Sequence, residues 1–433
     1  MKKIFALLTL AFVLTSAPSA AWSQTPSPAP SVAPTPNIPA NADPATATRL
    51  WLDTVPPEKK ASSDSYFEGG YWLILWDFLL GSAISILLLA TRFSAGLRNF
   101  AERRTRFKAL QITIYAVVYL LLTTLLTFPL MVYEKYFREH AYGLSTQTFG
   151  AWFGELLKGL IIGVIGFSIL LIILYAVFRR APRTWWIWGT GVVVLFLMLG
   201  VLIAPIYIEP LFNKYKPLEN PEISGPILAM AQANEIPVKQ VFEVDASRQS
   251  NRVSANVAGF MGTTRIALND NLLKQCTLPE IRAVMAHEMG HYVLNHITKF
   301  LISFSLVTLV SFAITKWAFD AAVRKWGPRW DVRGIADPAG LPLLALIFGA
   351  ISFLMTPVTN TITRTSEREA DAFGINTSRE PTGMAMVALK LGTYRKLDPT
   401  PLEEFIFFDH PSGRNRIRMA MDWKAAHLPA RGE

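Results

Sequence analysis

The chain has 433 residues, of which 51% are hydrophobic and 12% aromatic, a composition that excludes an ordinary soluble multidomain protein and indicates a polytopic membrane protein. Its formal net charge is +10, but the Lys and Arg cluster in short loops between apolar runs, so they indicate membrane orientation and no nucleic-acid partner is expected. Cys276 is the single cysteine, which excludes an internal disulfide and a cysteine-ligated metal cluster.

The first 23 residues have the layout of a secretory signal peptide. Lys2 and Lys3 precede an apolar stretch of about a dozen residues, and small residues follow. An uncleaved signal anchor is the alternative, although the segment is short for a full membrane span. Residues 24–69 begin with a Pro- and Ala-rich stretch that cannot bury a core, so a linker is predicted there.

Six apolar runs each come close to the roughly twenty residues that a membrane-spanning helix needs. They predict a mainly α-helical protein with a four-span region over residues 70–208 and a two-span hairpin over residues 300–358. A retained N-terminal segment would add a seventh span. The six runs lie at about 70–91, 110–133, 156–178, 184–208, 300–320 and 340–358.

The positively charged loops predict the orientation of these spans. The loop between the first two runs is expected to be cytoplasmic, because positively charged loops favour that side. It contains Arg92, Arg98, Arg103, Arg104, Arg106 and Lys108. Two further loops are also rich in positive charge, and each follows the previous one by two spans. The first contains Arg179, Arg180 and Arg183, and the second contains Arg324, Lys325, Arg329 and Arg333. Alternation places residues 209–299 and 359–433 on the opposite face. In a bacterium with such a signal, that is the periplasmic face of the inner membrane.

Residues 209–299 are of mixed polarity and predict the first part of a small α+β domain. A helix is expected in SGPILAMAQANE (224–235), and strands are expected in QVFEVDA (240–246) and TRIALND (264–270). The last two spans interrupt this domain, and residues 359–433 complete it.

The stretch MAHEMGHYVLNH contains three of the six histidines of the chain. His287, Glu288 and His291 form H-E-x-x-H, and residues four apart share one face of a helix, so both imidazoles can bind one metal ion with Glu288 beside them. Thr277 and Glu280 are spaced as a capping box that would start this helix. Helix-surface histidines without a ligand are the alternative.

A catalytic zinc site needs a third protein ligand and an open position for water. His296 follows His291 by five residues, which turn a helix through about 500°, so we expect a polar residue near the membrane surface rather than a ligand. Glu367 and Asp371 are better candidates, because one carboxylate could bind the metal while the other holds a ligand imidazole. Glu369, between them, points away from that face.

Two motifs, H-E-M-G-H at 287–291 and T-R-x-x-E-x-x-A-D-x-F at 363–373, occur together in this chain. In this combination the sequence resembles the type I CAAX prenyl endopeptidases, integral-membrane zinc metallopeptidases of the gluzincin type. The likeness covers most of residues 70–420. It extends through EHAYGLSTQT (139–148), APIYIEPLFNKYKPL (204–218), SANVAGFMGTTRIALND (254–270) and DHPSGRNRI (409–417).

The resemblance implies a role for each residue of the two motifs. The zinc ligands would be His287, His291 and Glu367. Glu288 would be the general base, and Asp371 would support a ligand histidine. The implied catalytic domain has a zincin-like fold, split around the last two spans.

The resemblance also implies residues for the substrate. His410 and Arg416 would line the substrate cleft near the developing oxyanion. Asn256, on an edge strand, would help to hold an extended peptide by strand addition.

The predicted function is hydrolysis of peptide bonds by a metal-activated water, on peptides that are tethered to the bilayer or exported. Prenylated CAAX proteins are not expected on the outer face that the loop charges indicate. Three alternatives remain open. They are a heat-shock-type membrane quality-control zinc protease, an intramembrane protease of the site-2 class, and a non-enzymatic transporter with a structural metal.

Overall fold

The computed structural model describes residues 35–39, 42–258 and 264–428. The expected signal segment, residues 1–23, lies outside the described residues. So does most of the Pro- and Ala-rich stretch that follows it.

The chain is already helical within the expected linker. Helix α2 (Pro44–Leu52) begins at Asp43, whose carboxylate accepts the backbone N–H groups of Ala45 and Thr46 as an N-cap. Trp51 of α2 is only 1% exposed, because it is buried in one hydrophobic cluster with residues of α17 (Gly413–His427). The predicted linker boundary at residue 69 is therefore wrong, since the chain folds from Pro44 onward.

Five helices of the described chain are long and apolar enough to cross a membrane, which confirms five of the six predicted spans. Two of them continue through short π- or 3-10-helical turns at their C-terminal ends. The five are α3 (Pro57–Ala90), α5 with its continuation to α6 (Lys108–Ala141), α7 (Phe149–Arg180), α8 with its continuation (Trp185–Leu211) and α12 (His296–Trp330).

The sixth predicted span is a bent pair of helices. Helix α13 (Leu341–Leu354) has 14 residues, which rise about 21 Å and do not cross the roughly 30 Å hydrocarbon core alone. Helix α14 (Thr356–Ser378) continues at 53° to it. The break falls at Met355, two residues before Pro357, which lacks an N–H for the helix ladder and whose ring clashes with the carbonyl one turn earlier.

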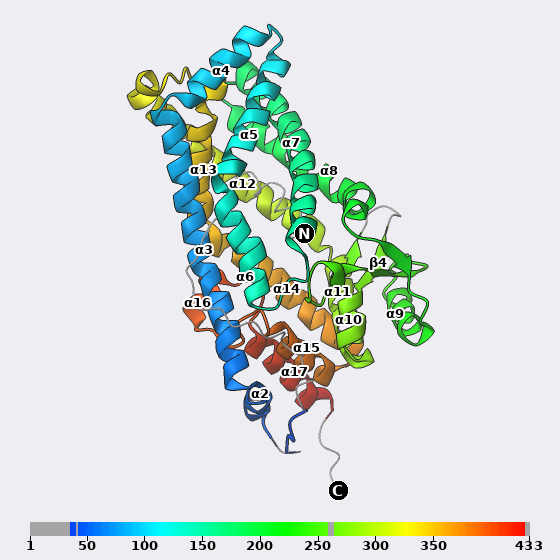
Figure 1. The fold of residues 1–433 in the computed structure, drawn as a ribbon. Coiled ribbons are helices and arrows are strands. Elements are labelled where there is room, and N and C mark those ends of the chain that lie inside the picture. Colours follow the sequence, from blue (N-terminus) through cyan, green and yellow to red (C-terminus); the bar gives the residue numbers. More distant parts are fainter. Residues whose placement is uncertain (1–34, 40–41, 259–263, 429–433) are drawn as a thin grey trace.

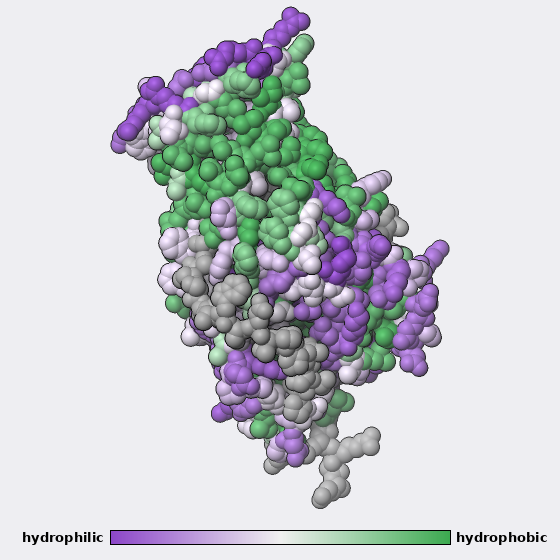
Figure 2. All heavy atoms as spheres, viewed as in Figure 1, coloured by the Kyte–Doolittle hydropathy of each residue, from purple (hydrophilic) through white to green (hydrophobic). Residues whose placement is uncertain are grey.

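The membrane helices stand side by side in the upper part of the view, with the short helix α4 (Phe93–Arg104) at the top (Figure 1). On the face that Figure 2 shows, a hydrophobic belt covers them between a hydrophilic cap at the α4 end and the hydrophilic lower part. Large side chains on the membrane helices are exposed, among them Ile161, Leu195 and Ile302. In water such a belt would be unfavourable, so it is the surface that faces lipid.

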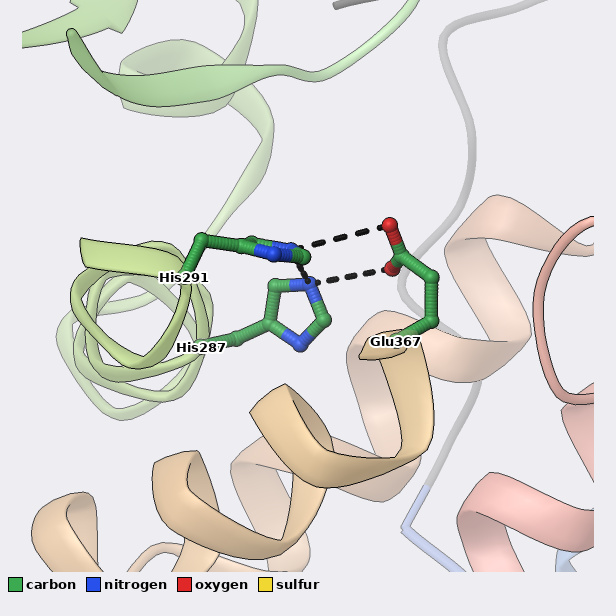
Figure 3. Close-up of side chains that lie close together, drawn as sticks. All are labelled: His287, His291 and Glu367. Atoms are coloured by element: carbon green, nitrogen blue, oxygen red, sulfur yellow. Dashed lines mark hydrogen bonds and ion pairs between the residues drawn. The ribbon is translucent and has the colours of Figure 1, made fainter. Parts of the chain in front are cut away.

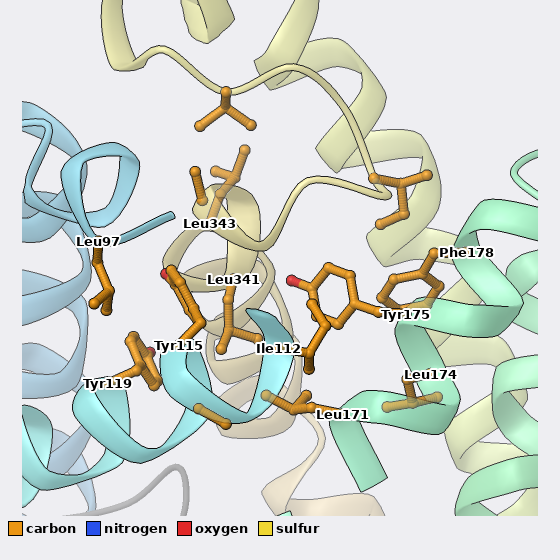
Figure 4. Packing of buried hydrophobic residues seen from close by; sticks show 14 of the residues in the cluster. Leu97, Ile112, Tyr115, Tyr119, Leu171, Leu174, Tyr175, Phe178, Leu341 and Leu343 are labelled. Carbon is orange, nitrogen blue, oxygen red and sulfur yellow. The ribbon is translucent and has the colours of Figure 1, made fainter. Parts of the chain in front are cut away.

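A buried cluster joins the helices at the α4 end. Tyr115 of α5 and Tyr175 of α7 are fully buried and lie near Leu341 and Leu343 of α13 (Figure 4). Beside it, the guanidinium of Arg98, 1% exposed, forms ion pairs of 2.6 Å with Asp331 and 2.7 Å with Asp337. These ion pairs tie α4 to the connection between α12 and α13.

A four-stranded sheet forms the core of the mixed-polarity part. Its order is β1-β2-β4-β3, with β2 and β4 parallel and the outer pairs antiparallel. The predicted helix at 224–235 and strands at 240–246 and 264–270 are confirmed. Strand β3 is an edge strand. The elements are β1 (Tyr215–Pro217), α9 (Pro221–Ala233), β2 (Val241–Val244), β3 (Ala255–Ala258), β4 (Arg265–Asn269), α10 (Asp270–Gln275) and α11 (Leu278–Val293).

The end of the chain packs against this part, as the sequence predicts for a domain that is completed after the last spans. Helix α14 lies directly against α11, and α15 (Pro381–Leu391) contacts both α11 and α17. The short helix α16 (Pro401–Phe407) packs on α14. The segment before α12 and the segment after α13 therefore pack against each other.

Candidate metal centre

Helix α11 carries the H-E-x-x-H motif and begins where the sequence predicts. Thr277 and Glu280 form the expected capping box. The Glu280 side chain is fully buried and pairs at 2.7 Å with Lys390 of α15. The start of α11 is therefore held both by its own cap and by the following part of the domain.

Two glycines let α11 and α14 approach each other closely. A Cβ added to Gly374 would lie 2.9 Å from the backbone nitrogen of His287, and one added to Gly290 would lie 3.2 Å from the Cα of Ala370. Real Cβ atoms do not pack at the first distance, so position 374 needs a residue without a side chain, and the second distance is tighter than most Cβ contacts. This close contact sets the distance between the motif on α11 and the carboxylates on α14.

His287, His291 and Glu367 converge on one point between the two helices (Figure 3). The Nε2 atoms of the two histidines are 3.2 Å apart. Glu367 Oε2 lies 3.3 Å from His287 Nε2, and the other oxygen, Oε1, lies 3.6 Å from His291 Nε2. Ligands about 2.0–2.2 Å from a tetrahedral ion are separated by about 3.3–3.6 Å. The three side chains therefore fit a tetrahedral metal ion with one corner open.

Asp371 lies on the far side of His287. Its Oδ1 is 2.8 Å from His287 Nδ1, and its Oδ2 is 2.9 Å from Nε of Arg416 on α17. The Arg416 guanidinium also lies 3.4 Å from Glu367. The sequence pattern left open which of the two carboxylates would be the third ligand. In the structure Glu367 faces the candidate site, and Asp371 contacts the other side of the His287 imidazole.

Glu288 follows His287 on α11 and is partly buried. Burial raises the pKa of Glu288 to about 7, although the nearby His287 acts in the opposite direction. A carboxyl group that titrates near neutral pH can both accept and return a proton.

His296 is placed by a break between α11 and α12 rather than by one continuous helix. It is fully buried, its Nδ1 is 2.9 Å from Nδ1 of His291, and its Nε2 is 3.0 Å from Glu369. The helical rotation of 500° does not apply, because Asn295 adopts a left-handed conformation with φ 53° and α12 starts anew at His296. His296 therefore lies outside the three-residue group and behind His291, with its ring buried at the start of the membrane-length helix α12.

Glu369 points away from the three-residue group, but it is linked to His291 through His296. Its Oε2 accepts from His296 and from Nζ of Lys299 at 2.5 Å. The sequence contains one signal for this arrangement, the Asn before His296, since Asn tolerates the left-handed region that breaks a helix.

The residues expected near the substrate lie close to the same group. His410 Nε2 is 3.1 Å from Glu367, and its Nδ1 is 2.7 Å from Asp409. Burial lowers the pKa of His410 to about 4, and the charge of Arg395 acts in the same direction. Asn256 lies on β3, which packs beside α11, and its buried Oδ1 has no hydrogen-bond partner among the described residues.

Comparisons with known proteins agree with this architecture. Residues 47–214 match the family described as CAAX prenyl protease N-terminal, five membrane helices, and residues 217–424 match peptidase family M48. The uncharacterized metalloprotease YhfN of Bacillus subtilis (strain 168) is 31% identical over 366 residues, covering 84% of this chain and 86% of that protein. The chain belongs to peptidase family M48.

Two further similarities bear on the fold of this M48 metalloprotease. CAAX prenyl protease 1 of Saccharomyces cerevisiae is 29% identical over 322 residues, 70% of each chain. The crystal structure of S. mikatae Ste24p has the same fold, with a TM-score of 0.71 at 22% identity over 85% of this chain and 90% of that one. The predicted fold class and the resemblance are therefore confirmed, and the protein is an integral-membrane metallopeptidase of this family.

Proposed function

We propose that this M48 metalloprotease is a zinc endopeptidase that cleaves peptides at the membrane surface, with His287, His291 and Glu367 as its metal ligands. The observation that supports this most directly is the convergence of the two Nε2 atoms, 3.2 Å apart, with the Glu367 carboxylate, whose Oε2 lies 3.3 Å from His287 Nε2 and whose Oε1 lies 3.6 Å from His291 Nε2. Two imidazoles and one carboxylate with an open fourth position are a typical catalytic zinc set.

A metal bound at this site supplies Lewis acidity, which lowers the pKa of a bound water and polarises a carbonyl group. Glu288 then serves as the general base, accepting a proton on its carboxylate and returning it to the leaving amine. Its pKa of about 7 suits both transfers.

Asp371 and Arg416 act as positioning residues in this proposal. Asp371 Oδ1, 2.8 Å from His287 Nδ1, is the acceptor that would hold the proton on Nδ1 and leave Nε2 free to bind metal. Arg416 contacts both Asp371 and Glu367, so its positive charge favours the ionised form of each carboxylate. The same guanidinium lies close enough to the metal group to support a developing oxyanion.

His410 and Asn256 are proposed to contact the substrate. The Nε2 of His410 faces the metal group, a position from which an Nε2–H can donate to the oxyanion. Asn256 has a buried acceptor without a partner on the edge strand β3, and an extended peptide that adds to this edge would supply a donor.

The position of α11 supports a site at the membrane surface rather than within the bilayer. Helix α11 is not among the five membrane-length helices of the described chain. Only Leu294 and Asn295 separate it from α12, which is one of the five. Peptides that are tethered to the bilayer or emerge from it are therefore the proposed substrates.

The loop charges support a periplasmic active site. The Arg-rich helix α4 lies at the end of the molecule opposite to α11, α15 and α17 (Figure 1). Fusions of a compartment reporter after Arg104 and after Pro411 should therefore report opposite sides of the inner membrane. The same side for both would overturn this orientation.

The test of the catalytic assignment is Glu288→Gln in purified, detergent-solubilised protein. Zinc content and cleavage of casein or a reporter peptide are measured on the same sample. We expect retained zinc with abolished cleavage, because Glu288 is not a ligand. Unchanged cleavage would remove Glu288 from the mechanism, and a wild-type protein without bound zinc would contradict the zinc assignment.

A further inference from the structure

Helix α16 (Pro401–Phe407) exposes apolar side chains and turns its acidic ones toward the protein. Two of its large apolar residues, Leu402 and Phe405, are 66% and 51% exposed, whereas Glu403 and Glu404 are partly buried. A helix on a surface in water has the opposite arrangement, with its apolar side inward and its charges outward. The reversed pattern indicates an apolar environment outside α16.

The acidic side chains of α16 have partners within the protein. Glu403 pairs at 2.7 Å with Nζ of Lys396. Glu404 accepts the backbone N–H of Ser412 at 3.0 Å and the side-chain amide of Asn415 at 2.9 Å. The exposed residues of α16 are all apolar, so this side of the helix carries no charge that would oppose insertion into a bilayer.

The contact with α3 places α16 at one boundary of the membrane. The ring centres of Phe407 and Tyr71 are 3.8 Å apart, and those of Phe408 and Phe67 are 4.6 Å apart. From Tyr71 to Ala90, the last residue of α3, the helix rises about 28 Å, close to the roughly 30 Å of the hydrocarbon core. Tyr71 therefore lies at the edge of the core, and α16 lies beside this part of α3 (Figure 1).

The exposed side of α16 has exposed apolar neighbours on both adjoining helices. Trp72 of α3 is 60% exposed, and tryptophan is enriched at the boundary between lipid and water. The start of α14 holds α16 through Asn360, whose side-chain amide donates to the carbonyl of Ile406 at 2.7 Å. Leu354 and Val358, which precede Asn360 at the bend between α13 and α14, are also exposed. Lipid that covers the membrane helices can therefore cover α16 without a break.

The chain runs directly from α16 into the candidate metal site. His410 is the third residue after α16, and its Nε2 lies 3.1 Å from Glu367. Nη1 of Arg364 on α14 donates to the carbonyl oxygens of Glu404 at 2.7 Å and of Phe408 at 2.5 Å. A shift of α16 relative to α14 would therefore move the backbone next to His410.

We propose that α16 inserts Leu402 and Phe405 into the leaflet on the side of the metal site, and that this contact with lipid holds the substrate cleft at the surface of the bilayer. The position of α16 in the leaflet does not depend on the proposed peptidase function. Its effect on cleavage rests on that function, because it favours a peptide whose anchor lies in the same leaflet.

Spin labels at single cysteines measure the position of α16 directly. In a Cys276→Ser background, which removes the only native cysteine, labels are attached at Leu402→Cys or Phe405→Cys, and the protein is reconstituted into liposomes. Ile161→Cys on α7 is the lipid control and Glu222→Cys on α9 is the water control, because both side chains are exposed. Collisions of each label with oxygen, which concentrates in lipid, are compared with collisions with a water-soluble nickel chelate.

We expect both α16 labels to lose most of the nickel accessibility that the Glu222 label has, and to approach the Ile161 label in oxygen accessibility. Nickel accessibility equal to that of the Glu222 label would place α16 in water and overturn the proposal. Dipolar broadening of the α16 spectra that disappears on dilution with unlabelled protein would identify a second copy of the chain as the occupant, and it would also overturn the proposal.

A double variant tests the effect on cleavage. Leu402→Asn with Phe405→Asn should raise KM for a palmitoylated reporter peptide in liposomes by about tenfold, because two apolar side chains no longer hold α16 in lipid. Cleavage of the same peptide without palmitate, in detergent, should change by less than about twofold. Leu428→Asn is the matched control, because Leu428 is exposed at the end of α17. An unchanged KM for the palmitoylated peptide, or an equal rise in the control, would contradict the role of α16 in holding the cleft.

The two experiments separate this inference from the proposed function. Labels of α16 in water, together with cleavage that depends on Glu288, contradict only the insertion of α16. Labels of α16 in lipid, without Glu288-dependent cleavage of any peptide, contradict only the peptidase proposal.

Discussion

The Nδ1 atom of His296 lies 2.9 Å from the Nδ1 atom of His291, so a ring from the start of α12 supports a histidine of the candidate metal site from behind. If Glu369 accepts Nε2–H of His296, the Nδ1 of His296 can accept Nδ1–H of His291. That arrangement leaves His291 Nε2 without a proton and free for the metal.

His296→Leu removes the acceptor for His291 Nδ1–H, so we expect zinc affinity to fall by about 10- to 100-fold. His296→Asn keeps an oxygen near the Nδ1 position and should retain more of the affinity. Competition with a chromophoric chelator measures both. Equal affinity in wild type and His296→Leu would show that the contact does not orient the ligand.

Asp371→Asn tests the corresponding contact on His287. Because an amide can present a donor to Nδ1 and carries no charge, we expect zinc affinity to fall by about 10- to 100-fold. The change should be measured at saturating zinc as well, where cleavage recovers if Asp371 acts through metal binding. Asp422→Asn on α17 is the control, because Asp422 is exposed and pairs only within its own helix with Arg418. A loss of affinity in the control would point to a general charge effect.

Gly374→Ala places a methyl group 2.9 Å from the backbone of His287. Overpacking of this kind lowers the free energy of unfolding by about 1–3 kcal/mol, and it should also weaken zinc binding by moving α14 from α11. Gly225→Ala in α9 has open space around the new Cβ and should be neutral or slightly stabilising. Thermal unfolding in detergent compares the two variants, and similar melting temperatures would contradict the close-packing argument.

Arg98→Ala leaves the carboxylates of Asp331 and Asp337 without their shared guanidinium. Breaking a buried ion pair in this way typically destabilises a protein by about 3–5 kcal/mol. Arg333→Ala, which removes an exposed pair with Glu102, should change stability by about 1 kcal/mol or less. Thermal unfolding of the two variants should therefore differ clearly, with zinc stoichiometry unchanged in both because neither residue lies near the candidate site.

Local sequence patterns predicted several parts of this structure correctly. Five of the six predicted spans are single membrane-length helices, because span length follows directly from helical rise and bilayer thickness. The capping box at Thr277 and Glu280 indicated where α11 begins. The spacing of His287 and His291 put both rings on one face of that helix.

Other features of the structure could not be predicted from local patterns, because they depend on contacts between segments that are distant in the sequence. The choice of Glu367 over Asp371 depends on how close α14 lies to α11, and α12 and α13 separate these segments in the chain. The placement of His296 depended on one left-handed residue, Asn295, which interrupts the helical rotation. The burial of Trp51 depended on α17 at the other end of the chain.

The sequence alone therefore determined which side chains share a helix face and which segments enter the membrane, since both follow from periodicity and length within one segment. Only the tertiary structure decided which carboxylate meets the two histidines and which groups stand behind them. Those distances arise from the close contact at Gly290 and Gly374, and packing between segments leaves no periodic signal in the chain.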